Sequence, residues 1–258
     1  MIKLFRKFRK KTLNENKTQR YFKYALGEII LVVIGILIAL QINTWNENRK
    51  ATNEEVKILT ALNSDFEDSK KRIEETMVMQ NKVMDYSQVL IDIHERQDPK
   101  DFEYLDKNLD SLDYLISYGT SWYRAEPVTG AYKSLISAGK IDLIQNEDLR
   151  HLLAQFSADL ESGFEDHEIS MQILDKLIDD TSDFILKIAS NKFRDRLNYK
   201  PRQIKSAEIS ESFFSKNRYF GNLYLKSILE ENRITRQQLM LDQTNAILSI
   251  INKELNKK

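Results

Sequence analysis

Three histidines and the acids near them are the residues of this sequence whose side chains could bind a metal ion or move a proton. They are His94, His151 and His167. Asp148-x-x-His151 has the helical spacing that can chelate a metal, but a di-metal helical bundle needs the Glu-x-x-His pattern on two facing helices together with further acids. The sequence offers one such pair. We therefore interpret these residues as polar positions on solvated helix surfaces.

Other catalytic patterns are absent from the sequence. It contains no Cys, so it has neither a thiol nucleophile nor a thiolate metal site. It also lacks G-x-S-x-G, H-E-x-x-H, a Gly-rich phosphate loop and a dinucleotide fingerprint. We therefore predict no enzymatic activity and assign no catalytic, cofactor-binding or metal-binding residue.

The composition favours long helices. Among 258 residues there are seven Gly and three Pro, whereas 30% of the residues are charged. No stretch sustains the alternation of apolar and polar residues that is typical of a strand. The elements that must position any functional side chain are therefore expected to be helices.

An apolar run without a polar side chain extends from Ile29 to Leu40. Tyr24 and Trp45 bracket it, and a helix between them would be roughly 32 Å long. That length matches a hydrocarbon core of about 30 Å with an aromatic residue at each water interface. We predict a transmembrane helix over residues 24–45.

Charge predicts the orientation of this helix. Residues 1–23 carry nine Lys/Arg and one acid, so a basic cytoplasmic tail in contact with anionic lipid headgroups is expected, with residues 46–258 in the periplasm. The protein would then be a single-pass protein of the cell inner membrane. One alternative is a cleaved signal peptide, although no small-x-small cleavage site follows the run. Another is a basic arm for nucleic acid, which the adjoining span disfavours, so no nucleic-acid partner is predicted.

Two features inside the span suggest further roles. Glu28 is an acid about one turn inside Tyr24, either a functional residue or one that reaches the interface and pairs with Lys23 or a headgroup. Gly35 and Ala39 form a small-xxx-small pair that would let two spans approach closely. Homo-oligomerisation through the span is therefore predicted.

Residues 20–50, RYFKYALGEIILVVIGILIALQINTWNENRK, resemble the N-terminal signature of a family of uncharacterised single-pass membrane proteins from Gram-negative bacteria. Residues 131–153, AYKSLISAGKIDLIQNEDLRHLL, also resemble that family. It is a domain-of-unknown-function family. The resemblance implies a membrane-anchored helical protein, and it brings no known activity and no catalytic residue.

Helix boundaries can be predicted beyond the span. The first helix continues out of the membrane and ends before Asp98-Pro99, because proline disfavours helical geometry in the residue before it. Next we expect one helix carrying Phe102 to Ile116. Another follows around Leu135 with Gly139 as its C-terminal cap, and then one capped by Asn146. A short helix near 210–214 precedes a last helix over about 217–256.

The two longest helices each show an apolar stripe with near-heptad spacing. The predicted inward residues are Val56, Leu59, Leu62, Phe66, Ile73, Met77, Met84 and Ile91 in the first, and Phe220, Leu223, Ile228, Ile234, Leu241, Leu248 and Ile251 in the last. These stripes predict an all-α fold, in which the transmembrane helix is followed by an elongated up-down-up-down helical bundle ectodomain. The first stripe suits either the core of one chain or a coiled coil between copies.

Trp122 and Arg124 lie in a loop between two expected helices and are of the types that anchor interfaces. We predict that they form part of a partner surface; alternatively, Trp122 fills the core where two helices meet. The acidic ectodomain favours a basic partner. A protein-binding or sensing module of the cell envelope is the predicted function. The alternative is an envelope scaffold that acts by helix–helix self-association.

Overall fold

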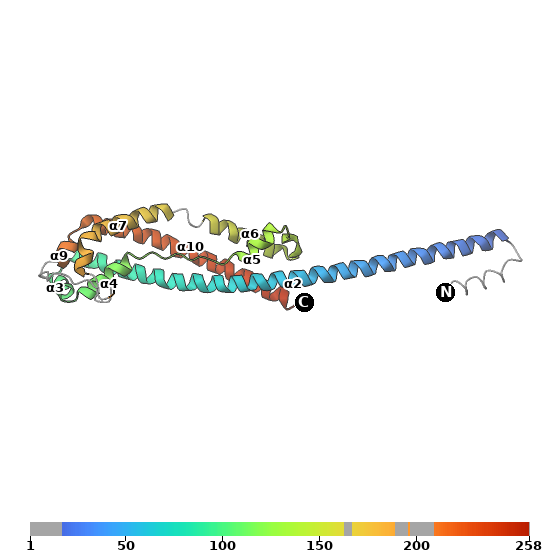
Figure 1. Cartoon of the computed structure of the whole chain (residues 1–258), viewed down its shortest axis with the longest axis horizontal. Helices are drawn as coiled ribbons and strands as arrows, with labels where there is room; N and C mark the ends of the chain where they lie inside the picture. Colours follow the sequence, from blue (N-terminus) through green and yellow to red (C-terminus); the bar gives the residue numbers. More distant parts are fainter. Residues whose placement is uncertain (1–16, 163–166, 189–195, 197–208, 258) are drawn as a thin grey trace. The chain divides into compact units, whose positions relative to one another are not determined.

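The computed structural model describes residues 17–162, 167–188, 196 and 209–257. It separates into two compact units, residues 1–56 and 57–258. Every regular element among the described residues is a helix, which confirms the all-α prediction (Figure 1). Most of the predicted basic tail, residues 1–16, lies outside the described residues.

Helix α2 (Lys17–Arg96) is continuous over 80 residues and supplies the regular structure of the first unit. Its side chains from Leu26 to Lys50 are all exposed. It stops at Arg96, as predicted, because Pro99 follows and Gln97 adopts a positive φ of 47°. Within the part of the chain that is described, this helix is the one long and apolar enough to cross a membrane.

The chain of the second unit turns back through short helices and one extended segment. Helices α3 (Pro99–Lys107) and α4 (Leu109–Gly119) replace the single helix that the sequence predicted over this stretch. The single-helix prediction was wrong because Asn108 breaks the helix: its φ is −126° and ψ 60°, and its side-chain amide donates to the Tyr104 carbonyl (2.8 Å).

After an extended segment come α5 (Gly130–Ser137) and the short 3-10 helix η1 (Ile141–Leu143). Gly139 has a φ of 63°, so it closes α5 in the left-handed conformation that the sequence indicated. Asn146 accepts a hydrogen bond from the Leu149 backbone N–H (2.9 Å) and caps the next helix, also as predicted.

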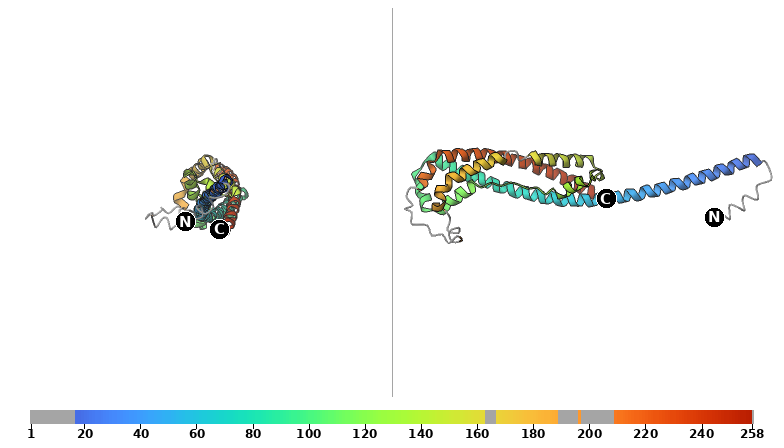
Figure 2. Two further views of the ribbon diagram at one scale, coloured as in Figure 1. Left: turned by 90° about the vertical axis from the view of Figure 1, so that its right-hand side faces the viewer. Right: turned by 45° about the horizontal axis from the view of Figure 1, so that its top comes forward.

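Helices α6 (Glu147–Ser162) and α7 (His167–Ile188) run from the end of the bundle that holds α5 towards the end that holds α3 (Figure 1). Helix α9 (Ile209–Phe214) then leads into α10 (Asn217–Leu255), which runs in the opposite direction (Figure 1). Asn146 donates to Glu254 (2.9 Å) at one end of this pairing, and Lys216 donates to the Asp180 carbonyl (2.7 Å) at the other. Helices α6 and α7 therefore lie antiparallel along α10 (Figures 1 and 2). The second unit is an elongated bundle with up-down-up-down topology.

The core of this bundle has two apolar clusters. The first, which we call the Phe-rich cluster, comprises Leu90, Ile93, Phe102, Leu105, Leu112, Ile116, Ile173, Leu177, Phe184, Ile209, Phe213, Phe214, Tyr219, Phe220 and Leu223. The second, the Leu/Ile cluster, comprises Leu59, Leu62, Phe66, Ile73, Ala125, Leu135, Ile144, Leu149, Leu153, Phe156, Met240, Ile247, Leu248 and Ile251. Buried apolar residues of α2 between Leu59 and Ile93 pack in these clusters of the same chain, so the core of the bundle covers the stripe that suited a coiled coil.

The predicted stripe of α10 was wrong over its middle third. Ile228 is 44% exposed, whereas Lys226 and Glu230 on either side of it are buried. The residues that face the core follow a regular heptad register, but four of them in succession are polar. The prediction used apolar residues alone, so in the middle of α10 it assigned the exposed Ile228 to the core and missed the buried polar residues.

Candidate functional site

The residues predicted at the span lie on the exposed surface of α2. Tyr24 is 52% exposed and Trp45 64%, and the Arg49 guanidinium lies 6.0 Å from the Trp45 ring centroid. Gly35 and Ala39 are exposed one turn apart, and a Cβ built on Gly35 would meet nothing within 4 Å. The interface and span-packing roles of these four residues stay predictions.

The histidines take different positions in the bundle. The His94 ring stacks on Phe220 at 4.1 Å, and its Nδ1 donates to the Phe214 carbonyl (2.7 Å), so it joins α2 to the turn before α10. His151 is exposed on α6. Among the described residues, no three His, Asp or Glu side chains gather in a way that could hold a metal ion.

The extended segment Thr120–Thr129, which we call the strap, lies along α2 and is held there by α2 side chains. Gln80 donates to the Tyr123 carbonyl (3.1 Å), and Arg72 donates to the Glu126 carbonyl (3.2 Å). Ser69 accepts from the Val128 N–H at 2.8 Å. The residue numbers of the α2 partners decrease as those of the strap increase, so the strap runs antiparallel to α2. These hydrogen bonds substitute for the backbone pairing that an extended chain would find in a sheet.

Both ends of the strap are fixed to α2. Ser87 donates to the Gly119 carbonyl (3.0 Å), and a Cβ on Gly119 would lie 2.7 Å from Leu90 Cδ1, so a residue without a side chain suits this close approach. At the far end, the Ala131 N–H donates to the Asp65 carboxylate (2.6 Å). Inside the strap, Ala125 is buried in the Leu/Ile cluster.

Trp122 is half-buried, with polar neighbours. The Arg233 guanidinium carbon lies 4.8 Å from its ring centroid, a cation–π contact, and the His167 ring is 5.2 Å away. The Trp122 indole N–H is buried and has no hydrogen-bond partner. These contacts give Trp122 a packing role. Its predicted part in a partner surface is untested.

Beneath the strap lies a buried set of polar side chains, which we call the polar layer: Gln80 of α2, Ser170 of α7, and Lys226, Glu230, Arg233 and Gln237 of α10. None is more than 5% exposed. On α10 the layer falls between Leu223 of the Phe-rich cluster and Met240 of the Leu/Ile cluster. The bundle therefore has an ionic middle between two apolar parts.

Glu230 is the centre of the polar layer. One carboxylate oxygen lies 3.4 Å from Lys226 Nζ and accepts from Arg233 Nη1 at 3.3 Å. The other accepts from Gln80 Nε2, also at 3.3 Å. Arg233 Nη2 donates to Ser170 Oγ (2.7 Å), which ties α7 into the same network. One carboxylate thus bears two cationic neighbours.

Several polar atoms of this layer lack a hydrogen-bond partner, among them both amide atoms of Gln237 and Oε1 of Gln80. Burial lowers the pKa of Lys226, against the opposing effect of the neighbouring Glu230 carboxylate. Buried ions and unsatisfied amides cost stability relative to apolar residues of similar volume. The layer is therefore the least favourable part of the core.

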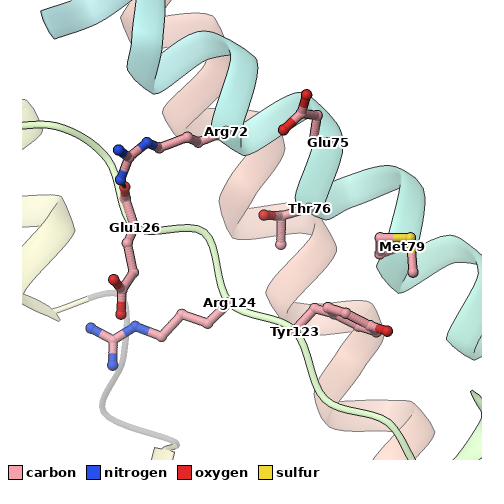
Figure 3. Close-up of a pocket in the computed structure, with 7 residues that line it drawn as sticks. All are labelled: Arg72, Glu75, Thr76, Met79, Tyr123, Arg124 and Glu126. Carbon is pink, nitrogen blue, oxygen red and sulfur yellow. Dashed lines mark hydrogen bonds between the residues drawn. The ribbon is translucent and has the colours of Figure 1, made fainter.

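On the outer side of the strap, a groove of about 350 Å³ runs between the strap and α2 (Figure 3). It is lined by Arg72, Glu75, Thr76, Met79, Tyr123, Arg124 and Glu126. Arg124 is exposed, and its side chain and that of Glu126 point toward one another. The mixed charges and the Tyr123 ring suit a polypeptide with both acidic and basic side chains.

A second groove of about 300 Å³ is aromatic and lies between α2 and α4. The Tyr86 ring packs edge-on against Tyr114 at 5.2 Å, and Tyr118 lies 4.3 Å from Tyr114. The Tyr86 hydroxyl donates to the Tyr114 hydroxyl at 3.3 Å. The three rings are therefore in contact with one another.

Sequence reasoning missed the polar layer and the tyrosine groove. A signal for the first was present, because Lys226, Glu230, Arg233 and Gln237 recur at steps of four, three and four, in register with Leu223 and Met240. The tyrosines come from two helices, and only the packing of α4 on α2 brings them together.

The fold and these sites define an all-α bundle joined to an exposed apolar helix. The chain belongs to a family of unknown function (DUF6090), whose model matches residues 28–162, just over half of the chain. This match supports the resemblance to an uncharacterised domain family. Comparison with curated proteins and with solved structures found no match.

Proposed function

We propose that the protein is a membrane-anchored module of the cell envelope that recognises another protein and has no enzymatic activity. The observation that carries the proposal is that every residue of the apolar run Ile29–Leu40 on α2 is exposed. An exposed apolar surface of this extent calls for a membrane or a protein to cover it. Its length fits a bilayer, and the basic residues before it favour a cytoplasmic N-terminus in the inner membrane.

Recognition of a protein, rather than of a small molecule, is favoured by the kind of surface that the bundle offers. Sites for small molecules are usually concave and mostly apolar, with a few polar groups. The groove beside the strap is instead lined by two arginines, two glutamates and a tyrosine. We assign the recognised surface to Arg124 and its neighbours, with Trp122 holding the strap in place beneath them. The negative charge of residues 51–258 favours a basic partner.

Orientation is tested by a reporter enzyme that is active only in the periplasm. A fusion after Lys258 should be active, and a fusion before Met1 should not. The reverse result would contradict the proposed placement of the bundle in the periplasm.

Recognition is tested by affinity capture from solubilised membranes, comparing wild type with Arg124→Ala. Lys176→Ala, a change at an exposed cation on α7, is the matched control. One envelope protein should be captured by wild type and by the control but lost with Arg124→Ala. Equal capture by all three would rule out the Arg124 surface. Recovery of this chain alone, reduced by Gly35→Leu in the span, would favour the alternative of a self-associating scaffold.

A further inference from the structure

The strap and the polar layer meet at two places. Gln80 donates both to the Tyr123 carbonyl of the strap (3.1 Å) and to Glu230 of the layer (3.3 Å). Trp122 covers the Arg233 guanidinium at 4.8 Å. The segment between Gly119 and Ala125 is thus the part of the strap that rests on polar groups, whereas Gly119 and Ala125 themselves are buried.

Thr120 and Ser121 are hydrogen-bonded to carbonyls at the end of α4, so the weakly held part of this segment begins at Trp122. Gly119 is packed against Leu90 of the Phe-rich cluster, and Ala125 is part of the Leu/Ile cluster. Between them, the indole N–H of Trp122 and both amide atoms of Gln237 are buried without hydrogen-bond partners. Water entering the layer would supply those partners, so opening here recovers hydrogen bonds that opening an apolar cluster would not.

We propose that residues Trp122–Arg124 form a lid that opens locally over the polar layer while both apolar clusters stay folded. In the open form Trp122 leaves Arg233, and water reaches Ser170, Glu230 and Gln237. Tyr123 and Arg124 line the surface groove, so opening also dismantles that groove. Opening of the lid is a conformational change of the bundle alone and requires no partner.

Local opening of this kind is expected in the parts of a fold where stability is lowest. The lid is short, has no regular structure and is fixed at both ends, which is the arrangement of a small hinged cover. A closed lid covers the ionic network, and an open lid exposes it to bulk water. The bundle therefore has two states that differ in the position of Trp122.

The absence of cysteine from the chain makes the lid testable by thiol labelling of the full-length protein in detergent. Ser170→Cys places a thiol in the polar layer, at a position that is 5% exposed. Thr244→Cys is the matched control, because Thr244 is 0% exposed and lies on α10 beside the Leu/Ile cluster. Each labelling rate is divided by the rate for the same thiol in denaturant.

The Ser170→Cys thiol should react at least about tenfold faster than the Thr244→Cys thiol, because only the first becomes accessible without global unfolding. Trp122→Ala should accelerate labelling at position 170 and leave position 244 almost unchanged. Conversely, Lys226→Met/Gln237→Leu should slow labelling at position 170, since an apolar layer gains less from hydration.

Equal rates at the two positions in the otherwise unchanged chain would overturn the proposal, whatever the further variants do. If Trp122→Ala acts through global stability alone, it will accelerate the labelling of both thiols by the same factor. That outcome would show that Trp122 is a core residue and that no lid exists.

Discussion

The polar layer and the apolar clusters occupy the same bundle, on the same heptad register, and are stabilised in opposite ways. In the Phe-rich cluster, Phe213 contacts the rings of Phe214, Tyr219 and Phe220 at 4.9 to 5.7 Å, and burial alone favours such packing. In the polar layer, Glu230 must offset the desolvation of two cations. The clusters stabilise the bundle by apolar burial, whereas the layer requires that Glu230 lie opposite its cationic and amide partners.

This difference bears on how the bundle can move. Opening an apolar cluster exposes hydrocarbon to water, which is costly over its whole area. Opening the layer hydrates charges and amides that are incompletely paired when buried. A rearrangement of the bundle should therefore begin at the layer, and the strap above it should respond first.

Removal of the central carboxylate should have the largest effect on stability. Glu230→Ala leaves Lys226 and Arg233 buried without their shared anion, so we expect a loss of about 3 to 5 kcal/mol in the free energy of unfolding. Denaturant titration of the full chain in detergent would measure it. Glu231→Ala is the matched control on the exposed face of α10, and it should leave the midpoint nearly unchanged. Similar midpoints for both variants would mean that the layer is hydrated in the native state.

Truncation in an apolar cluster should have a somewhat smaller effect. Leu223 is fully buried at the edge of the Phe-rich cluster, and Leu223→Ala should cost about 2 to 5 kcal/mol through lost burial and a residual cavity. Leu225→Ala, at a position 51% exposed, is the control. Labelling of Ser170→Cys should also be measured in both of these variants. In the Leu223→Ala variant, labelling at position 170 should rise only by the factor that the loss of global stability accounts for.

Much of the fold was predictable from the sequence because local rules govern it. Pro99 predicts the end of α2, and the caps at Gly139 and Asn146 were recognisable by residue type and position. The single helix predicted over 102–116 failed at Asn108, since nothing in its neighbours' apolar spacing signals a break. The strap was expected as a loop, but its extended course along α2 depends on hydrogen bonds with residues far away in sequence.

The candidate site was harder to predict for a physical reason. A heptad stripe is normally recognised by its apolar residues, and charged residues at core positions look like surface. Lys226 and Glu230 therefore looked solvated, although a shared register with Leu223 and Met240 places them inside. Burial of charge is settled by partners on other helices, and those partners cannot be read from one helix.

Gln237 provides a third test of the comparison, with an effect of opposite sign. Both of its amide atoms are buried without hydrogen-bond partners, so Gln237→Leu should stabilise the bundle by about 1 to 2 kcal/mol. Thr244→Val, at a buried threonine whose hydroxyl donates to the Met240 carbonyl, is the control and should not stabilise. Destabilisation by Gln237→Leu would indicate that ordered water satisfies the amide in the native bundle.

The smallest predicted effect is a dependence of stability on pH that comes from Lys226. Burial lowers its pKa in the folded bundle, whereas the unfolded chain keeps the usual value of about 10.4. Between these two values the unfolded state binds more protons, so stability should rise as pH increases towards 10.

Lys226→Met removes this rise and should add about 1 kcal/mol to the free energy of unfolding at neutral pH, because Glu230 keeps its contacts with Arg233 and Gln80. The measurement must stay below about pH 10, since burial raises the pKa of Tyr219 and its ionisation in the unfolded state then lowers stability. A rise in stability with pH that persists in Lys226→Met would show that the rise does not come from Lys226, and Tyr219 is not an alternative source because its ionisation acts in the opposite direction.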